Sequence, residues 1–194
     1  MLIEDGTGSG RTAGVNAENK LEVVAVTAST EHATNHHDGL AFNICSEITP
    51  VPPDPSAGDY RSCIFYIKNT SEIDMTIEGI DIRLGGTGEE DVIEVVGRDS
   101  GSPLGGITVI PANLNLGSGN PAEGVFLQGS NITGIDGGEC LQRIWIKSNG
   151  TNSYNFNQDI IVPKNRIVTF YSRNSVAELD ITISFNYHPI IGAR

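Results

Sequence analysis

The sequence predicts an all-β protein built as one antiparallel β-sandwich. Period-2 alternation of apolar and polar side chains is clearest between Leu179 and Tyr187, which is the pattern of a half-buried antiparallel strand. The chain also holds 23 glycines and 9 prolines, which favour turns, and no long stretch shows helical spacing. With 194 residues, the chain is long enough for a single sandwich with a substantial core.

The N-terminal segment, residues 1–20, is rich in Gly, Ser, Thr and Asn and has few apolar side chains. Such a segment cannot bury enough surface to offset its ordering entropy. We therefore expect an extended arm that becomes ordered on contact with other chains, followed by one domain at 21–194. The first predicted strand, Leu21–Thr27, is apolar on both faces, which indicates burial between layers or between subunits.

A polar connector after this strand contains His32, His36 and His37. Histidine is the commonest metal ligand, and His32 and His36 would share a face in a helical turn. A further ligand cannot be assigned from the spacing, so the sequence predicts no metal site and leaves metal binding by these histidines open.

The next predicted strands are Leu40–Cys45, Arg61–Asn69 and Met75–Leu84. In the last of these strands the alternating apolar positions shift by one residue between Ile77 and Ile80, from odd-numbered to even-numbered positions. A one-residue slip turns every later side chain to the other face unless an extra residue is absorbed. We therefore predict a β-bulge or bend at the glycine between them, Gly79.

Shorter strands are predicted along the middle of the chain, and the glycine-rich loops within 85–121 are where we expect a binding surface. Leu141–Lys147 places Trp145, the only tryptophan, on the face opposite Ile144 and Ile146. The predicted strands number roughly nine to eleven, and their spacing along the chain is typical of a jelly-roll sandwich. The other short strands are predicted at Val92–Val96, Ile107–Ile110 and Val125–Leu127.

The last part of the chain reads as three strands joined by turns. Tyr154, Phe156, Ile160 and Val162 fall on one face of the first strand. Pro163–Asn165 then predicts a tight turn, because proline presets φ and Asn tolerates the left-handed region. Two further strands are predicted at Ile167–Tyr171 and Leu179–Tyr187.

The formal net charge is −12 and the sequence pI is about 4.6, which disfavours binding to nucleic acid. No apolar run is long enough to span a membrane, and the N-terminus does not resemble a signal peptide. Three cysteines, Cys45, Cys63 and Cys140, lie in strand-like segments. This odd number without a secretion signal predicts reduced, buried thiols.

The sequence contains no Gly-x-Ser-x-Gly nucleophile motif. Three of the four histidines lie in one polar connector, and His188 precedes a proline at the end of the last strand. We therefore predict that the chain is not an enzyme, with no catalytic residues, no cofactor-binding residues and no metal ligands.

Residues 3–27 contain an Asp-Gly-Thr-Gly arm and a Val-Asn-x-x-Asn-x-Leu step into the first strand. This segment, together with Phe65–Ser71 and Tyr154–Asn165, resembles virion proteins of tailed bacteriophages. The resemblance touches most of the chain and rests on arm and turn residues, and it transfers no catalytic residue.

This resemblance implies a structural part of a phage particle, assembled in the host cytoplasm. The leading hypothesis is a trimeric jelly-roll cement (decoration) protein that binds the major capsid protein through its arm and β body. A tail, neck or fibre component of the same particle is the alternative. A carbohydrate-binding sandwich is the hypothesis from another class, and an exposed row of aromatic residues on one sheet would favour it.

Overall fold

A computed structural model describes residues 2–4, 12–14, 35, 37–51, 61–85, 89–135, 137–148, 151–174, 176 and 178–188. The chain divides into two compact units, Met1–Ala33 and Thr34–Arg194. In the first unit, β1 (Leu2–Glu4) pairs with β2 (Thr12–Gly14) in antiparallel fashion.

The pairing of β1 with β2 was not foreseen from the sequence. The rest of the predicted arm, the predicted strand Leu21–Thr27, and both His32 and His36 lie outside the described residues. The extended arm and its boundary at residue 20 therefore remain predictions.

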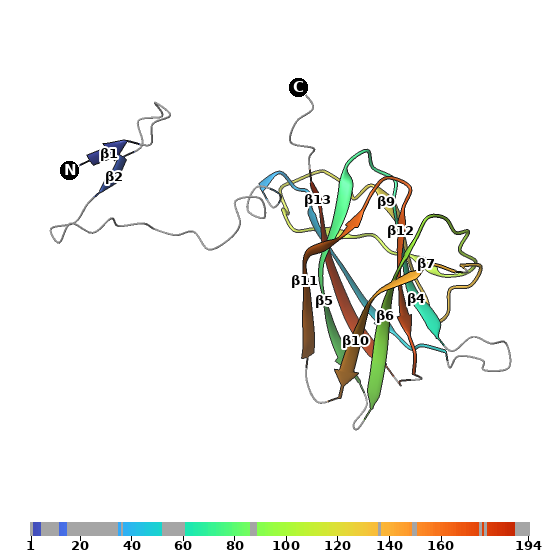
Figure 1. Ribbon diagram of the computed structural model, residues 1–194. Helices are drawn as coiled ribbons and strands as arrows, with labels where there is room; N and C mark the ends of the chain where they lie inside the picture. Colours follow the sequence, from blue (N-terminus) through green and yellow to red (C-terminus); the bar gives the residue numbers. More distant parts are fainter. Residues whose placement is uncertain are drawn as a thin grey trace. The chain divides into compact units, whose positions relative to one another are not determined.

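The second unit is an all-β sandwich of two antiparallel sheets, which confirms the predicted fold class (Figure 1). The six-stranded sheet has the order β10-β6-β12-β4-β9-β7, and the five-stranded sheet has the order β11-β5-β13-β3-β8. The strands are β3 (Ala41–Ile48), β4 (Ser62–Asn69), β5 (Asp74–Leu84), β6 (Glu90–Arg98), β7 (Ile107–Thr108), β8 (Ala112–Asn113), β9 (Gly124–Gln128), β10 (Glu139–Lys147), β11 (Thr151–Val162), β12 (Ile167–Ser172) and β13 (Leu179–His188).

The strand order is that of a jelly roll, in which one long hairpin is rolled up into two sheets. Four antiparallel pairs make up this hairpin: β3 with β13, β4 with β12, β5 with β11, and β6 with β10. The first and third pairs lie together in the five-stranded sheet, and the other two lie together in the six-stranded sheet. The remaining strands, β7, β8 and β9, all belong to the connection between β6 and β10, residues 99–138, which we call the insertion.

The main core lies between the two sheets and is built from the alternating apolar residues of the facing strands. Phe185 of β13 lies at its centre, with its ring 5.4 Å from that of Phe42 and 5.3 Å from that of Phe126. Tyr187 packs edge-on against Phe185 and donates a hydrogen bond to the Glu123 carbonyl oxygen at 2.9 Å. These contacts join β3, β13 and the insertion strand β9 in one packing unit.

The predicted bulge in β5 is confirmed. Ser184 of β13 pairs with Gly79, and the next residue, Phe185, pairs with Ile77, so Glu78 is the extra residue. A Cβ atom added at Gly79 would lie 2.8 Å from the Tyr154 carbonyl oxygen, so a side chain at this position would clash with β11. The bulge lets Met75 and Ile77 point into the same core as Ile80 and Ile82, and all four side chains are buried.

The β11 strand departs from the uninterrupted alternation that the sequence predicts. Four residues, 156–159, lie between Asn155, which pairs with Gly79, and Ile160, which pairs with Ile77, so the pairing with β5 is interrupted there. Asn157 and Gln158 there have φ values of 50° and 66°, and Asn155 Oδ1 accepts a hydrogen bond from the Asn157 backbone nitrogen. The side-chain amide thus stabilises a turn that apolar spacing alone does not reveal.

The predicted turn at Pro163–Asn165 is confirmed. The Arg166 backbone nitrogen donates to the Pro163 carbonyl oxygen at 3.0 Å, and Asn165 has a φ of 64°. Asn69 holds this turn against β4, because its side-chain nitrogen donates to the Val162 carbonyl oxygen at 2.8 Å.

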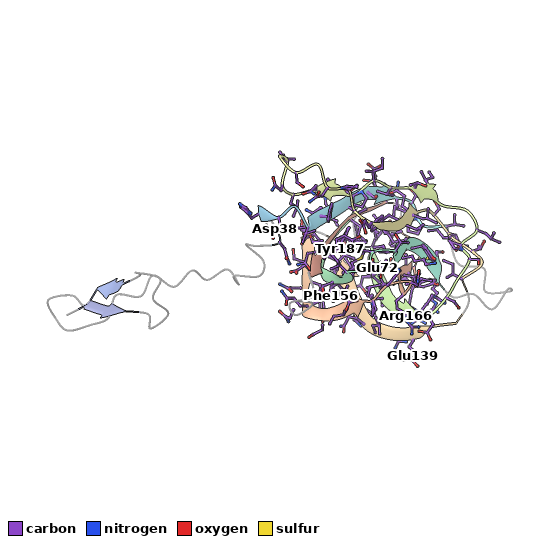
Figure 2. All side chains as sticks on the ribbon, turned by 90° about the horizontal axis from the view of Figure 1, so that it is seen from above. Asp38, Glu72, Glu139, Phe156, Arg166 and Tyr187 are labelled. Carbon is purple, nitrogen blue, oxygen red and sulfur yellow. The ribbon has the colours of Figure 1, made fainter. Side chains whose placement is uncertain are left out.

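The insertion covers part of the outer face of the six-stranded sheet and creates a second, smaller core there. Ile132 and Ile135 of the insertion pack on outward-facing side chains of β4, β6 and β12. In Figure 2 the insertion, coloured yellow-green to yellow, runs along one side of the body. The sheet residues of this outer core are Cys63, Tyr66, Val96, Ile167 and Tyr171. The central strands are therefore buried on both faces.

The cysteine prediction is wrong in part. All three cysteines are free, but only Cys63 is buried, whereas Cys45 and Cys140 are exposed. Cys45 lies on the outer face of β3, and Cys140 lies beside the irregularity at the start of β10. Apolar neighbours in sequence did not show which face of each strand is covered.

Selective alkylation tests this arrangement of the thiols. Burial raises the pKa of Cys63 to about 12, and the thiolate is the reactive form. We expect iodoacetamide at mildly alkaline pH to label Cys45 and Cys140 in the folded protein and to label Cys63 only after unfolding, as read by peptide mass spectrometry. Labelling of native Cys63 as fast as Cys45 would contradict the outer core.

Candidate interaction surface

The sequence predicted no catalytic, cofactor-binding or metal-ligating residues, and it left the histidine connector open. Of that connector, His37 is described: it is exposed, and its Nδ1 atom lies 3.2 Å from Asp38 Oδ1. His188 ends β13, as predicted. Metal binding by His32, His36 and His37 therefore stays untested. No helix in the described part of the chain is long and apolar enough to cross a membrane.

One acidic group was not foreseen. Glu47, Glu178 and Asp180 have carboxylate oxygens within 4.8 Å of one another. Glu47 and Asp180 are cross-strand partners in β3 and β13, which brings the two carboxylates together. Acidic groups of this kind are common on a chain with a net charge of −12, and we assign this one no role.

A group of arginines surrounds Glu94 on the outer face of the six-stranded sheet. Glu94 of β6 is buried, and its two carboxylate oxygens each accept a 2.8 Å hydrogen bond, one from Arg61 and one from Arg143. Arg173 lies 3.7 Å from the same carboxylate. Burial raises the pKa of Glu94, but the hydrogen bonds from Arg61 and Arg143 and the charge of Arg173 outweigh burial and hold this pKa below its ordinary value.

Tyr171 of β12 extends this charged network toward the insertion. The Arg61 guanidinium carbon lies 4.2 Å from the centre of the Tyr171 ring, and that of Arg98 lies 5.5 Å from it. Arg98 also donates to Thr169 Oγ1 at 3.2 Å and to the Tyr171 hydroxyl. The network thus ties together β4, β6, β10 and β12 across the outer face, and its chemistry is that of a structural link.

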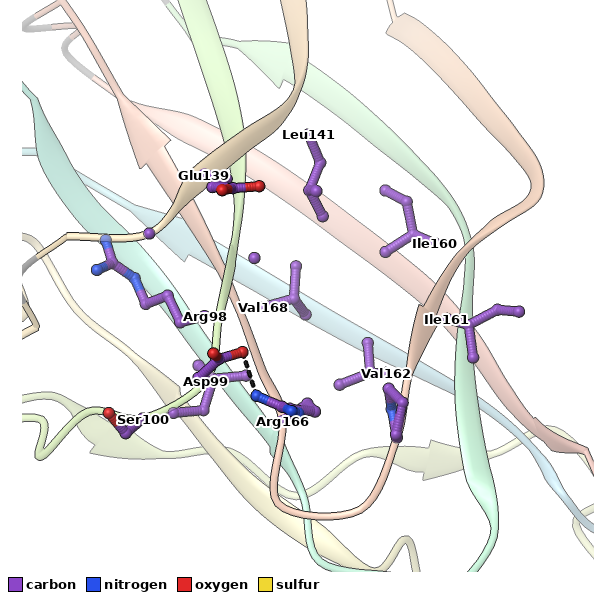
Figure 3. A pocket seen from close by; sticks show the side chains of 14 residues that line it. Arg98, Asp99, Ser100, Glu139, Leu141, Ile160, Ile161, Val162, Arg166 and Val168 are labelled. Atoms are coloured by element: carbon purple, nitrogen blue, oxygen red, sulfur yellow. Dashed lines mark ion pairs between the residues drawn. The ribbon is translucent and has the colours of Figure 1, made fainter.

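A hollow of about 570 Å³ lies where β10 and β11 separate (Figure 3). Apolar side chains, Leu141 of β10 and Ile160 of β11 among them, line its floor. An ion pair between Asp99 and Arg166 lies at its rim, drawn as a dashed line in Figure 3. Asp99 and Arg166 are therefore engaged with each other, and Arg98, which also lines the hollow, is bonded to Thr169 and Tyr171.

The most distinctive surface of the described residues lies on the insertion. Six of its large apolar side chains are exposed, and Ile110 and Leu116 are 88% and 96% exposed. We call these six residues the insertion surface: Leu104, Ile107, Ile110, Leu114, Leu116 and Val125. They account for more than half of the exposed large apolar residues in the described part of the chain.

The insertion surface is also depleted of charge. Residues 100–122 contain no Asp, Glu, Lys, Arg or His, and Glu123 is the only charged residue between 100 and 135. Elsewhere the chain is rich in charge, since charged residues make up 19% of the whole sequence. Exposed apolar side chains together with missing charges are the composition of the core of a protein–protein interface.

The sequence predicted a binding surface in the loops of 85–121, and the insertion surface lies largely within this range. It did not identify the residues, because short apolar runs in a glycine-rich segment resemble buried strands. The run at 100–122 was the available signal for this surface. It contains no charged residue, whereas buried strands of this chain have charged residues at or near their ends.

Comparison with known proteins adds no assignment: no protein-family model, no curated protein and no solved structure matches this chain.

Replacing Glu94 tests the charged network. We expect Glu94→Gln to lower the free energy of unfolding at pH 7 by about 1–3 kcal/mol, because three arginines lose their shared charged partner. Since the pKa of folded Glu94 is lowered, its stabilising effect is complete above the pKa of the unfolded chain and is lost as the pH falls through the folded-state value. Urea unfolding at pH 7 measures the loss in free energy of unfolding. Urea unfolding below about pH 4 measures how much of that loss remains once Glu94 is protonated.

The matched control is Glu90→Gln. Glu90 also lies on β6, but its partner Lys147 is 3.5 Å away and both side chains are exposed. This variant should change the free energy of unfolding by less than about 0.5 kcal/mol. Equal losses for the two variants at pH 7, or a Glu94→Gln loss that grows on acidification, would contradict the network.

Proposed function

We propose that this chain is a non-enzymatic structural protein of a tailed-bacteriophage particle, and specifically a capsid cement protein. The observation that carries the proposal is the insertion surface, which has the composition of a protein contact and lies on a stable jelly-roll body. The sequence resemblance of residues 3–27, Phe65–Ser71 and Tyr154–Asn165 to phage virion proteins supplies the kind of assembly.

The proposed mechanism divides the work between the two units. The body is rigid, because its central strands are buried on both faces. The arm, residues 1–20, supplies main-chain hydrogen bonds to neighbouring subunits of the particle, including the major capsid protein. If three copies act together, the linked arms raise the effective affinity by about 10²–10⁴ over a single arm.

A tail, neck or fibre component is the second candidate, since it would use the same body and arm at another place in the particle. The carbohydrate-binding alternative gains little support. Trp145 and Tyr154 are the exposed aromatic residues of the described chain, and they lie on β10 and β11 of different sheets. They do not form the aromatic row on one sheet that would favour a sugar-binding face.

Deletion of residues 1–20 tests the proposal. The truncated protein should stay folded, because the body's strands and both cores begin beyond residue 33. It should lose decoration of phage particles that lack the native copy, because the anchoring contacts are removed. Circular dichroism checks folding, and co-sedimentation with particles measures decoration.

The matched control replaces residues 1–20 with a Gly/Ser linker of equal length, which keeps the chain length but removes the arm's side chains. Its decoration should fall with that of the truncated protein, because the linker loses more conformational entropy when it orders and lacks the side chains that would fix the arm on the partner's surface. Full decoration by the truncated chain would show that the arm is not the anchor. Failure of the full-length chain to bind any phage head, neck or tail assembly would overturn the proposed function itself.

A further inference from the structure

We propose that the insertion surface is the site at which copies of this chain bind one another. The surface joins the two edges of the sandwich on one side of the body. Its first part, around β7, is the edge of the six-stranded sheet, and its second part, around β8, is the edge of the five-stranded sheet. Ile110 lies on the short link between these two strands, so exposed apolar residues lie in or next to both edge strands and on the link that joins them.

Charge favours a second copy as the occupant. The chain carries a net charge of −12, so two copies repel each other through most pairs of faces. The insertion, with Glu123 as the only charge between residues 100 and 135, is the part of the chain that two copies can bring together with the least repulsion. A strongly acidic or basic partner would find no complementary charges on it.

The surface is held in place before any partner binds. The backbones of Leu104 and Thr133 exchange two hydrogen bonds, of 2.7 and 3.0 Å. The Val109 nitrogen donates to the Phe126 carbonyl oxygen at 3.0 Å, and the Leu114 nitrogen donates to the Ala41 carbonyl oxygen at 2.9 Å. A contact that is already ordered loses little conformational entropy on association.

Side chains anchor the same segment to the start of the body. Asn113 donates to the Gly39 carbonyl oxygen at 2.9 Å, and Asn115 donates to the His37 carbonyl oxygen at 2.8 Å. Asn113 Oδ1 in turn accepts a hydrogen bond from the Asn115 backbone nitrogen at 2.9 Å. The asparagines of this uncharged run therefore shape the backbone, which leaves the neighbouring leucines directed outward.

The contact is made by side chains and not by extension of a sheet. The edge strands β7 and β8 have two residues each, and Pro103, Pro111 and Pro121 lie along the same segment. Short strands and prolines prevent continuous pairing between sheet edges. The partner copy therefore packs against Leu104, Ile110 and Leu116 and does not add a strand.

This self-association does not depend on the assignment to a phage particle. It names a surface for the homo-oligomer, for which the sequence had suggested the strand faces near Leu21–Val26, which lie outside the described residues.

The test is the mass of the full-length protein across a dilution series, measured by light scattering and by sedimentation velocity. We expect the wild type to form a closed oligomer that dissociates on dilution. The double variant Ile110→Asp/Leu116→Asp should raise the dissociation constant by at least about 10²-fold, because it places charges in an apolar contact. Both substituted side chains are almost fully exposed in the single chain, so folding should be unchanged by circular dichroism.

The matched control is Trp145→Asp/Ile161→Asp, which changes two exposed apolar residues outside the insertion surface, on β10 and β11. This variant should associate like the wild type. A wild type that is monomeric at every concentration overturns the proposal, as does an Ile110/Leu116 variant that associates normally. Equal dissociation of the control variant would also overturn the proposal, because the weaker association would then be caused by added negative charge at any position. Particle decoration, measured separately, reports on the proposed function and not on this contact.

Discussion

Burial of both faces of the central strands of the six-stranded sheet is the constraint on which the structure depends. All six residues of β12 are buried, and most of β4 and β6 is buried with them. One face of these strands packs on the opposite sheet, while the other needs the insertion and the Glu94 network as cover. The insertion is thus part of the folded body, because without it Tyr66, Val96 and Tyr171 would face water.

The same constraint explains the distribution of charge. Where the outer face is covered by arginines, Glu94 holds them in place through two 2.8 Å hydrogen bonds. Asp91 acts similarly at the other end of β6: it accepts hydrogen bonds from Ser172 and from the backbone nitrogens of Arg173 and Asn174, although burial raises its pKa. Buried charged side chains thus lie where they link neighbouring strands, whereas the insertion surface is apolar.

Local patterns predicted the elements well and their partners poorly. Alternation identified β13, and the phase slip identified the bulge at Gly79, because both are set by neighbouring residues. The partner of each strand and the exposure of Cys45 and Cys140 depend on contacts between distant segments, whereas the turn at Asn157 depends on the neighbouring Asn155 side chain, which apolar spacing does not reveal. The insertion surface was predicted in part. The sequence indicated binding loops in this region, but only the fold shows that their leucines and isoleucines point outward.

The central claim is that this chain is a structural subunit whose insertion surface is buried between copies. Electron cryo-microscopy of a phage particle that incorporates the chain tests it most directly. We expect density for the jelly-roll body on the outer capsid face, with the insertions of neighbouring copies in contact around Ile110 and Leu116. Bodies that lie on the particle with their insertions facing solvent would contradict this contact between copies.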